Sequence, residues 1–191
     1  MKIAATTFCF AFLATAAWGE TIDPARIIDA ATGDWDQDGQ QDLAILAASA
    51  EDGGQIGIYI YLRDGEHQLL RLAVSAPGKI SGTTDADGAF GQEPSINAIG
   101  KASIAIHSQN SAMGRDRWDQ TLTLVYRDKQ FIVAGYTYNY YDTLDPNAGA
   151  SCDYNALTGS MQKNGKSVEA TPKTIAIEDW TDETGQAICG K

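Results

Sequence analysis

The alternation of apolar and polar residues along this chain predicts β-strands far more often than helices. Isoleucine occupies every second position from Ile56 to Ile60, and the same period of two places Leu122, Leu124 and Tyr126 on one face of another segment. No stretch of about 12 residues shows a convincing helical period. Strands are expected over residues 43–48, 55–62, 68–74, 95–99, 102–107, 119–126, 131–141, 154–157 and 174–177.

Short polar turns separate most of these segments and predict antiparallel pairing. Residues 63–66 read Arg-Asp-Gly-Glu between two expected strands, which is typical of a β-hairpin. Residues 127–130 separate a second pair in the same way. Repeated hairpins at this spacing favour an all-β fold, with antiparallel sheets in a sandwich, a barrel or a small propeller-like arrangement.

The N-terminus has the features of a signal peptide. Lys2 precedes an apolar run from Ile3 to Ala17, and the small residues Ala17 and Gly19 fit a cleavage site after position 19. The alternative, a membrane anchor, would need about 20 apolar residues. We therefore expect a signal peptide over residues 1–19 and a periplasmic or secreted protein without membrane insertion.

The remaining residues, 20–191, suit a single β-rich domain with a substantial core. A loop rich in Gly, Thr and Asp is expected over residues 81–93. It would divide residues 20–80, with an acidic loop and a first hairpin, from a larger sheet in residues 81–191. The first part is too small to bury a core of its own.

The chain is acidic, with 25 Asp and Glu against 14 Lys and Arg and a formal net charge of −11. Nucleic acids and anionic membranes select positive protein surfaces, so this balance argues against both as partners. It favours divalent cations or a basic protein partner, and lysozyme-like enzymes are often basic.

Two cysteines remain after removal of the leader, Cys152 and Cys189. An even count in an oxidising compartment predicts a disulfide between them. The alternatives are free thiols, a metal site or a catalytic Cys–His pair, and the last two have only His67 and His107 to draw on.

Residues 34–42 read DWDQDGQQD, which places carboxylates at alternate positions before a glycine. Calcium takes about six to eight hard oxygen ligands from a backbone that curls around the ion. Carboxylates this close repel one another strongly without a cation, which favours a calcium site over a solvated acidic turn. The expected Ca²⁺ ligands are Asp34, Asp36, Asp38, Gln40 and Asp42.

This loop differs from an EF-hand, because Ile45 stands where the closing glutamate is required and the following residues predict a strand. The run GDWDQDGQQDLAIL resembles the calcium loop of FG-GAP and VCBS repeats, which implies a structural ion at a turn before a strand. A second acidic run at residues 85–88 has only two carboxylates and is expected to be an ordinary turn.

Three further runs carry a second resemblance: DGAFGQEPSINAIGKASIAIHSQNS, RDRWDQTLTLVYRDKQFIVAGYTYNYYDT and CDYNALTG. Together with the acidic loop they resemble periplasmic proteins related to the inhibitors of invertebrate-type lysozymes (PliI). They also resemble calcium-binding immunity proteins that neutralise peptidoglycan hydrolases. The resemblance covers about two-thirds of the mature chain and implies a protein that binds and inhibits a lysozyme-like hydrolase.

In that family a loop enters the hydrolase cleft, where polar side chains meet a catalytic carboxylate. The matching segment is residues 108–118, although the serine-glycine-tyrosine pattern of the inhibitors is absent from it. Trp118 could instead be a core residue, the tyrosines could cover a sheet face, and the segment could be a polar connection. The resemblance implies partner contacts by Ser108, Asn110, Ser111, Arg115, Arg117, Tyr138, Tyr140 and Tyr141.

Two other functions compete with hydrolase inhibition. An extracellular FG-GAP/VCBS-like binding or adhesion module would recognise a glycan or a protein, although such modules carry several acidic loops and this chain has one. An enzyme is the least supported, because Glu66, Glu93 and Glu178 form no pattern and no nucleophile elbow, metalloprotease helix or phosphate loop is present. We therefore expect a protein that is not an enzyme.

Overall fold

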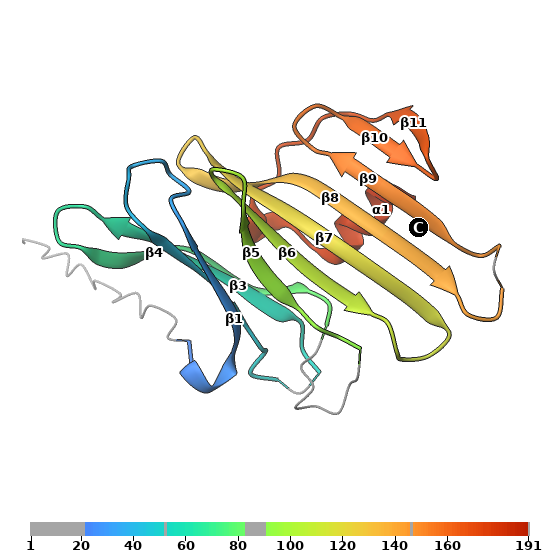
Figure 1. Ribbon diagram of the computed structural model, residues 1–191, viewed down its shortest axis with the longest axis horizontal. Helices are drawn as coiled ribbons and strands as arrows, with labels where there is room; N and C mark the ends of the chain where they lie inside the picture. Colours follow the sequence, from blue (N-terminus) through green and yellow to red (C-terminus); the bar gives the residue numbers. More distant parts are fainter. Residues whose placement is uncertain (1–21, 52, 83–90, 146, 191) are drawn as a thin grey trace, which may run out of the picture.

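The computed structural model describes residues 22–51, 53–82, 91–145 and 147–190, which form two antiparallel sheets (Figure 1). The expected signal peptide and most of the loop expected over residues 81–93, including residues 85–88, lie outside this part. The first sheet contains β1 (Ile27–Gly33), β2 (Asp42–Ala47), β3 (Ile56–Asp64) and β4 (Leu69–Ile80) in chain order. The second contains, also in chain order, β5 (Ser95–Ile99), β6 (Ser103–Asn110), β7 (Asp116–Arg127), β8 (Gln130–Asp142), β9 (Ala150–Asn155), β10 (Ser160–Lys163) and β11 (Lys166–Glu169).

The two sheets share one hydrophobic core, so the prediction of an all-β sandwich is confirmed. Buried side chains of the first sheet, such as Ile58 and Ile60, belong to the same cluster as Ile106 and Leu122 of the second. Edge strands β1 and β5 lie next to each other, and the backbone N–H of Ile96 donates to Oδ2 of Asp29 at 2.8 Å. Two sheets that cover each other in this way bury the alternating apolar residues of both.

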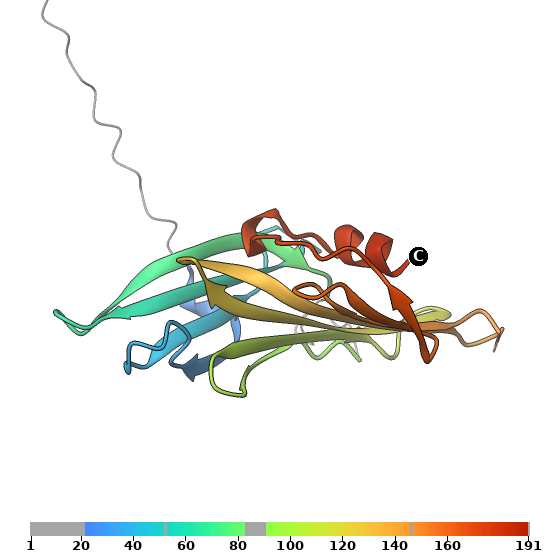
Figure 2. The same cartoon turned by 90° about the horizontal axis from the view of Figure 1, so that it is seen from above.

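The C-terminal segment covers the part of the core that the first sheet leaves open. It contains η3 (Ile177–Asp179) and α1 (Asp182–Cys189) and runs along the side of the molecule between β4 and β9 (Figure 2). Trp180 is fully buried, with its ring centroid 5.1 Å from that of Tyr136. A Cβ at Gly185 would lie 2.6 Å from the Tyr136 ring, so only glycine lets α1 approach this closely.

The disulfide between Cys152 and Cys189 is present and joins β9 to the last residue of α1. It indicates a non-reducing environment. No helix in the described part of the chain is long and apolar enough to cross a membrane.

Most expected strands form, but several bounds differ from the prediction. Strand β6 continues to Asn110 and β7 begins at Asp116, so the loop expected over residues 108–118 is a turn of residues 111–115. The expected strand 154–157 is wrong after Asn155, whose side chain accepts backbone hydrogen bonds from Leu157 and Thr158 and so forms a turn.

Residues 174–177 are also not a strand. They make one isolated bridge between Ile132 and Ala176 and then enter η3. In the described part of the chain, the sequence also did not predict η1 (Pro24–Arg26), β1, the two strands of the β10–β11 hairpin, or the eight-residue helix α1. Strand β1 reads IIDAATG, which has no clean period of two, and it forms because β2 and β5 flank it.

Candidate functional site

The loop of residues 34–42, which we call the aspartate loop, connects β1 to β2 and is anchored by Trp35. The indole of Trp35 is 1% exposed and packs in the core. It lies against Gly33, where an added Cβ would be 2.8 Å from its Nε1 atom. Gln37 and Gly39 have positive φ angles of 63° and 89°, so the chain turns back sharply here.

Three of the predicted ligands converge in this loop. Ligand oxygens of Asp34, Asp36 and Asp42 all lie within 4.8 Å of one another. Asp38 is not in that group, and its Oδ1 accepts a 2.7 Å hydrogen bond from the backbone N–H of Gln40. The structure therefore brings three carboxylates together. Asp38 and Gln40 are instead joined by the hydrogen bond from the Gln40 amide to the Asp38 carboxylate.

Backbone amides fix the orientation of these carboxylates. Asp42 is 1% exposed, and its two oxygens accept 2.9 Å hydrogen bonds from the amides of Trp35 and Arg63. Oδ2 of Asp34 accepts from the amide of Gly39 at 3.1 Å. The other oxygen of Asp34, Oδ1, is buried and has no hydrogen-bond partner.

The local electrostatics reflect this crowding of negative charge. Burial raises the pKa of Asp36, and the nearby carboxylates of Asp42, Asp38 and Asp34 raise it further. Burial also raises the pKa of Tyr126, with a further contribution from Asp36 and Asp42. Tyr126 belongs to β7 of the second sheet, and two carboxylates of the aspartate loop affect its pKa. The aspartate loop of the first sheet therefore lies close to the second sheet.

These residues fit a hard divalent cation. All the donors are oxygens, and each carboxylate oxygen that accepts one backbone hydrogen bond retains a second lone pair. A cation would use the buried Oδ1 of Asp34 as a ligand and offset the repulsion among the three carboxylates. Its role in this loop would be structural, because the loop ends directly in β2.

The predicted partner-binding residues separate into buried and exposed groups. Ser108 is fully buried and Tyr138 is 2% exposed. Oγ of Ser108 accepts a hydrogen bond of 3.0 Å from Gln120, whose Oε1 accepts one of 2.8 Å from the Tyr136 hydroxyl. These three side chains satisfy one another's hydrogen bonds inside the core and are not available to a partner. Burial raises the pKa of Tyr136 well above its usual range.

Asn110 holds the turn between β6 and β7 in place. Its Nδ2 donates to the carbonyl oxygens of Met113 and Asp116 at 2.8 and 2.9 Å, and its Oδ1 accepts from the amide of Met113. Ser111 is exposed and bonds to the carbonyl of Gly91 through both its amide and its hydroxyl. The amide side chain of Asn110 is therefore occupied within the turn.

Residues 111–115 and 141–144 lie together at one end of the molecule, and we call them the tip. Nε of Arg115 donates to Oδ2 of Asp142 at 2.7 Å, and the amide of Thr143 donates to the carbonyl of Arg115 at 3.0 Å. This pair raises the pKa of Arg115 and lowers that of Asp142. Around it Tyr141 is 55% exposed and Leu144 is 76% exposed.

The other two predicted contact residues lie behind the tip. Arg117 and Tyr140 are half-buried, and one guanidinium nitrogen of Arg117, Nη1, is buried without a hydrogen-bond partner. The ring of Tyr140 lies 5.9 Å from that of Tyr138. Among the predicted contact residues, Ser111, Arg115 and Tyr141 are the exposed ones.

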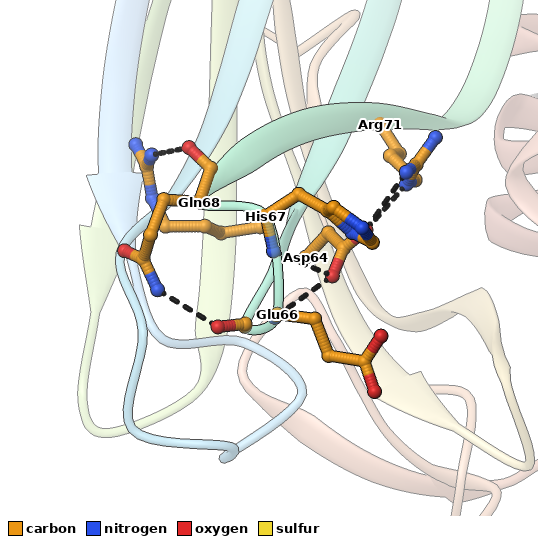
Figure 3. Close-up of polar contacts among 7 residues, drawn as sticks. Asp64, Glu66, His67, Gln68 and Arg71 are labelled. Atoms are coloured by element: carbon orange, nitrogen blue, oxygen red, sulfur yellow. Dashed lines mark hydrogen bonds and ion pairs between the residues drawn. The ribbon is translucent and has the colours of Figure 1, made fainter.

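The β3–β4 hairpin projects at the opposite end of the molecule from the tip (Figures 1 and 2). Its turn is organised by Asp64, which accepts hydrogen bonds from the backbone of Glu66 and from the side chains of His67 and Arg71 (Figure 3). The hydrogen bonds from His67 and then Arg71 hold the pKa of Asp64 far below its usual range. The sequence indicated a hairpin turn here but gave no sign of this polar network.

This chain matches no family model, no curated protein and no solved structure in the three comparisons. The described residues define an all-β sandwich with an acidic loop in the first sheet and an exposed tip on the second.

Proposed function

We propose that this protein is a periplasmic or secreted, calcium-stabilised inhibitor that binds a lysozyme-like peptidoglycan hydrolase through its tip. The observation that carries the proposal is a set of exposed side chains on a rigid support. Tyr141, Leu144 and Met113 are about half or more exposed, while the Arg115–Asp142 pair and Asn110 fix the backbone beneath them. Preorganised aromatic and apolar side chains at a loop end are typical of binding hot spots.

The overall charge supports a basic protein partner. A formal net charge of −11 would accelerate association with a positively charged hydrolase and make the rate fall with ionic strength. The calcium ion would stabilise the scaffold from the other sheet and would not touch the partner. The protein would act by occupying the partner's cleft and would carry out no chemistry itself.

Inhibition of cell-wall lysis tests this proposal. Purified residues 20–191, with calcium present, should slow the clearing of a bacterial cell-wall suspension by at least one class of lysozyme. Tyr141→Ala should weaken inhibition at least about tenfold. Leu69→Ala is the matched control, because Leu69 is 58% exposed and begins β4 in the β3–β4 hairpin, which projects at the opposite end of the molecule from the tip (Figure 1). An absence of inhibition across lysozyme classes and cell-wall hydrolases would refute the proposal.

Glycan binding is a second candidate, favoured by the outer face of the second sheet. Ile106 and Leu122 face the core, so His107 and Thr121 lie on the other face, where their side chains are 3.3 Å apart. On the same face Asn139 donates to Asp119 at 2.9 Å. Short polar side chains in register suit hydroxyl groups, and glycan-array binding without hydrolase inhibition would favour this function.

A further inference from the structure

Arg63, at the end of β3, contacts both the aspartate loop and the turn of the β3–β4 hairpin. Its Nε donates to the carbonyl oxygen of Gln41 at 2.8 Å, and its Nη1 donates to the carbonyl oxygen of Gln68 at 2.9 Å. Its backbone N–H donates to Oδ1 of Asp42 at 2.9 Å. One residue therefore bonds to two successive residues of the aspartate loop and to the hairpin.

The guanidinium group is well suited to this position. Its donors are held in a rigid planar fork, so it can bond to two carbonyl groups on different segments at once. Gln41 and Asp42 form the end of the aspartate loop, and Asp42 supplies one of its three converging carboxylates. A bond that fixes the Gln41 carbonyl also limits the directions that the Asp42 carboxylate can take.

Hydrogen bonds to Asp64 connect the residues of the hairpin turn, and Arg63 is attached to this turn through the carbonyl oxygen of Gln68. Gln68 has a positive φ of 57°, and its amide donates to the carbonyl of Asp64 at 2.7 Å. The amides of Glu66 and His67 donate to Oδ1 of Asp64 at 2.9 and 3.3 Å (Figure 3). A restraint on Gln68 therefore acts, through Asp64, on the amides of Glu66 and His67 as well.

We propose that Arg63 is a positioning residue that couples cation binding in the aspartate loop to the order of the β3–β4 hairpin. The inference rests on the cation binding proposed above. The cation fixes Asp42, and Arg63 connects that segment to Gln68 in the turn. Coupling of this kind is reciprocal, so a change that frees Arg63 from the loop weakens cation binding and loosens the turn together.

Substitution of Arg63 separates this coupling from a simple effect of charge. Arg63→Met removes both side-chain bonds but leaves the backbone N–H that Asp42 accepts. Residues that orient metal ligands typically change affinity by roughly 10- to 100-fold, so we expect Arg63→Met to bind calcium at least about tenfold more weakly. Arg63→Lys keeps the charge but cannot span two carbonyl groups. Its calcium affinity should therefore lie between those of the unaltered protein and Arg63→Met.

The experiment combines calcium titration calorimetry with hydrogen exchange. In the unaltered protein, calcium should slow exchange at the amides of Glu66, His67 and Gln68, and in Arg63→Met this effect should be lost. Arg71→Met is the matched control, because it removes a guanidinium from Asp64 but none from the aspartate loop. It should bind calcium as the unaltered protein does, and circular dichroism should show that each variant is folded.

Three results would overturn the inference. Unaltered calcium affinity in Arg63→Met would show that Arg63 does not position the loop, although calcium binding itself would stand. Full affinity in Arg63→Lys would show that charge alone is responsible. No calcium binding by the unaltered protein would refute the proposed cation site together with the coupling.

Discussion

The backbone N–H of Ser81 donates a 2.6 Å hydrogen bond to Oδ2 of Asp182, which lies 101 positions later in the chain. Ser81 directly follows β4, and Asp182 is the first residue of α1. The ammonium group of Lys79 makes a second link, to the backbone carbonyl of Glu178. The C-terminal segment is therefore attached to the edge of the first sheet at one end and to β9 by the disulfide at the other.

Removal of the disulfide should destabilise the protein without changing its fold. We expect the double substitution of Cys152→Ser and Cys189→Ser to lower the free energy of unfolding by about 2–4 kcal/mol, because the bond constrains a long segment of the unfolded chain. Urea unfolding with and without reductant measures the effect. Reductant should lower the midpoint of the unaltered protein and leave that of the double variant unchanged. Equal midpoints for the two proteins in the absence of reductant would contradict the prediction.

Asp182 should matter through its acceptor oxygen. Asp182 is 2% exposed, and Asp182→Ala removes the acceptor of the half-buried Ser81 amide, which should cost about 1–3 kcal/mol of unfolding free energy. Asp182→Asn keeps an acceptor and should cost clearly less. Glu183→Ala is the control, since Glu183 is exposed in the same helical turn. Equal losses in the alanine and asparagine variants would show that the hydrogen bond is not the cause.

Much of the fold could be predicted because its central strands alternate cleanly and are joined by short turns. The β7–β8 hairpin forms where the sequence indicated it, with Leu122 opposite Tyr136. Helix α1 could not be predicted, because eight residues carry too little periodicity, and Gly185 inside it reflects contact with Tyr136. Ser108 could have been placed correctly, since it continues the inward set of Ile104 and Ile106 along β6.

The candidate site was predictable only where it is local in sequence. Alternation of carboxylates indicated Asp34, Asp36 and Asp42, which do converge. The contact of Arg63 with the loop depends on the register of β3 against β2, in which Leu43 lies opposite Tyr61. No local pattern encodes that register, so the residue that connects loop and hairpin emerges only from the folded structure.

The Asp64 network should make the hairpin sensitive to acid. The folded pKa of Asp64 lies below the unfolded value of about 3.9, so its contribution to stability is present above that pH and is lost as the pH falls through the folded pKa. His67→Ala removes the largest cause of the shift and should raise the Asp64 pKa in an NMR titration. Glu66→Ala, which keeps the backbone hydrogen bond, is the control. An unchanged Asp64 pKa in His67→Ala would contradict the assignment.

The substitution Asp36→Asn should change the melting temperature in opposite directions in the absence and in the presence of calcium. Its folded pKa is raised, so the stability that it contributes is complete below about pH 3.9 and is lost as the pH rises through the folded pKa. At neutral pH without a cation, Asp36→Asn removes a repelling charge and should raise the melting temperature in a chelator. With calcium, the same change removes a ligand and should lower the melting temperature relative to the unaltered protein. Asp153→Asn, at an exposed position outside the aspartate loop, should change neither. A loss of equal size with and without calcium would mean that Asp36 stabilises the loop by packing alone, so the reversal of sign is the property that identifies a cation ligand.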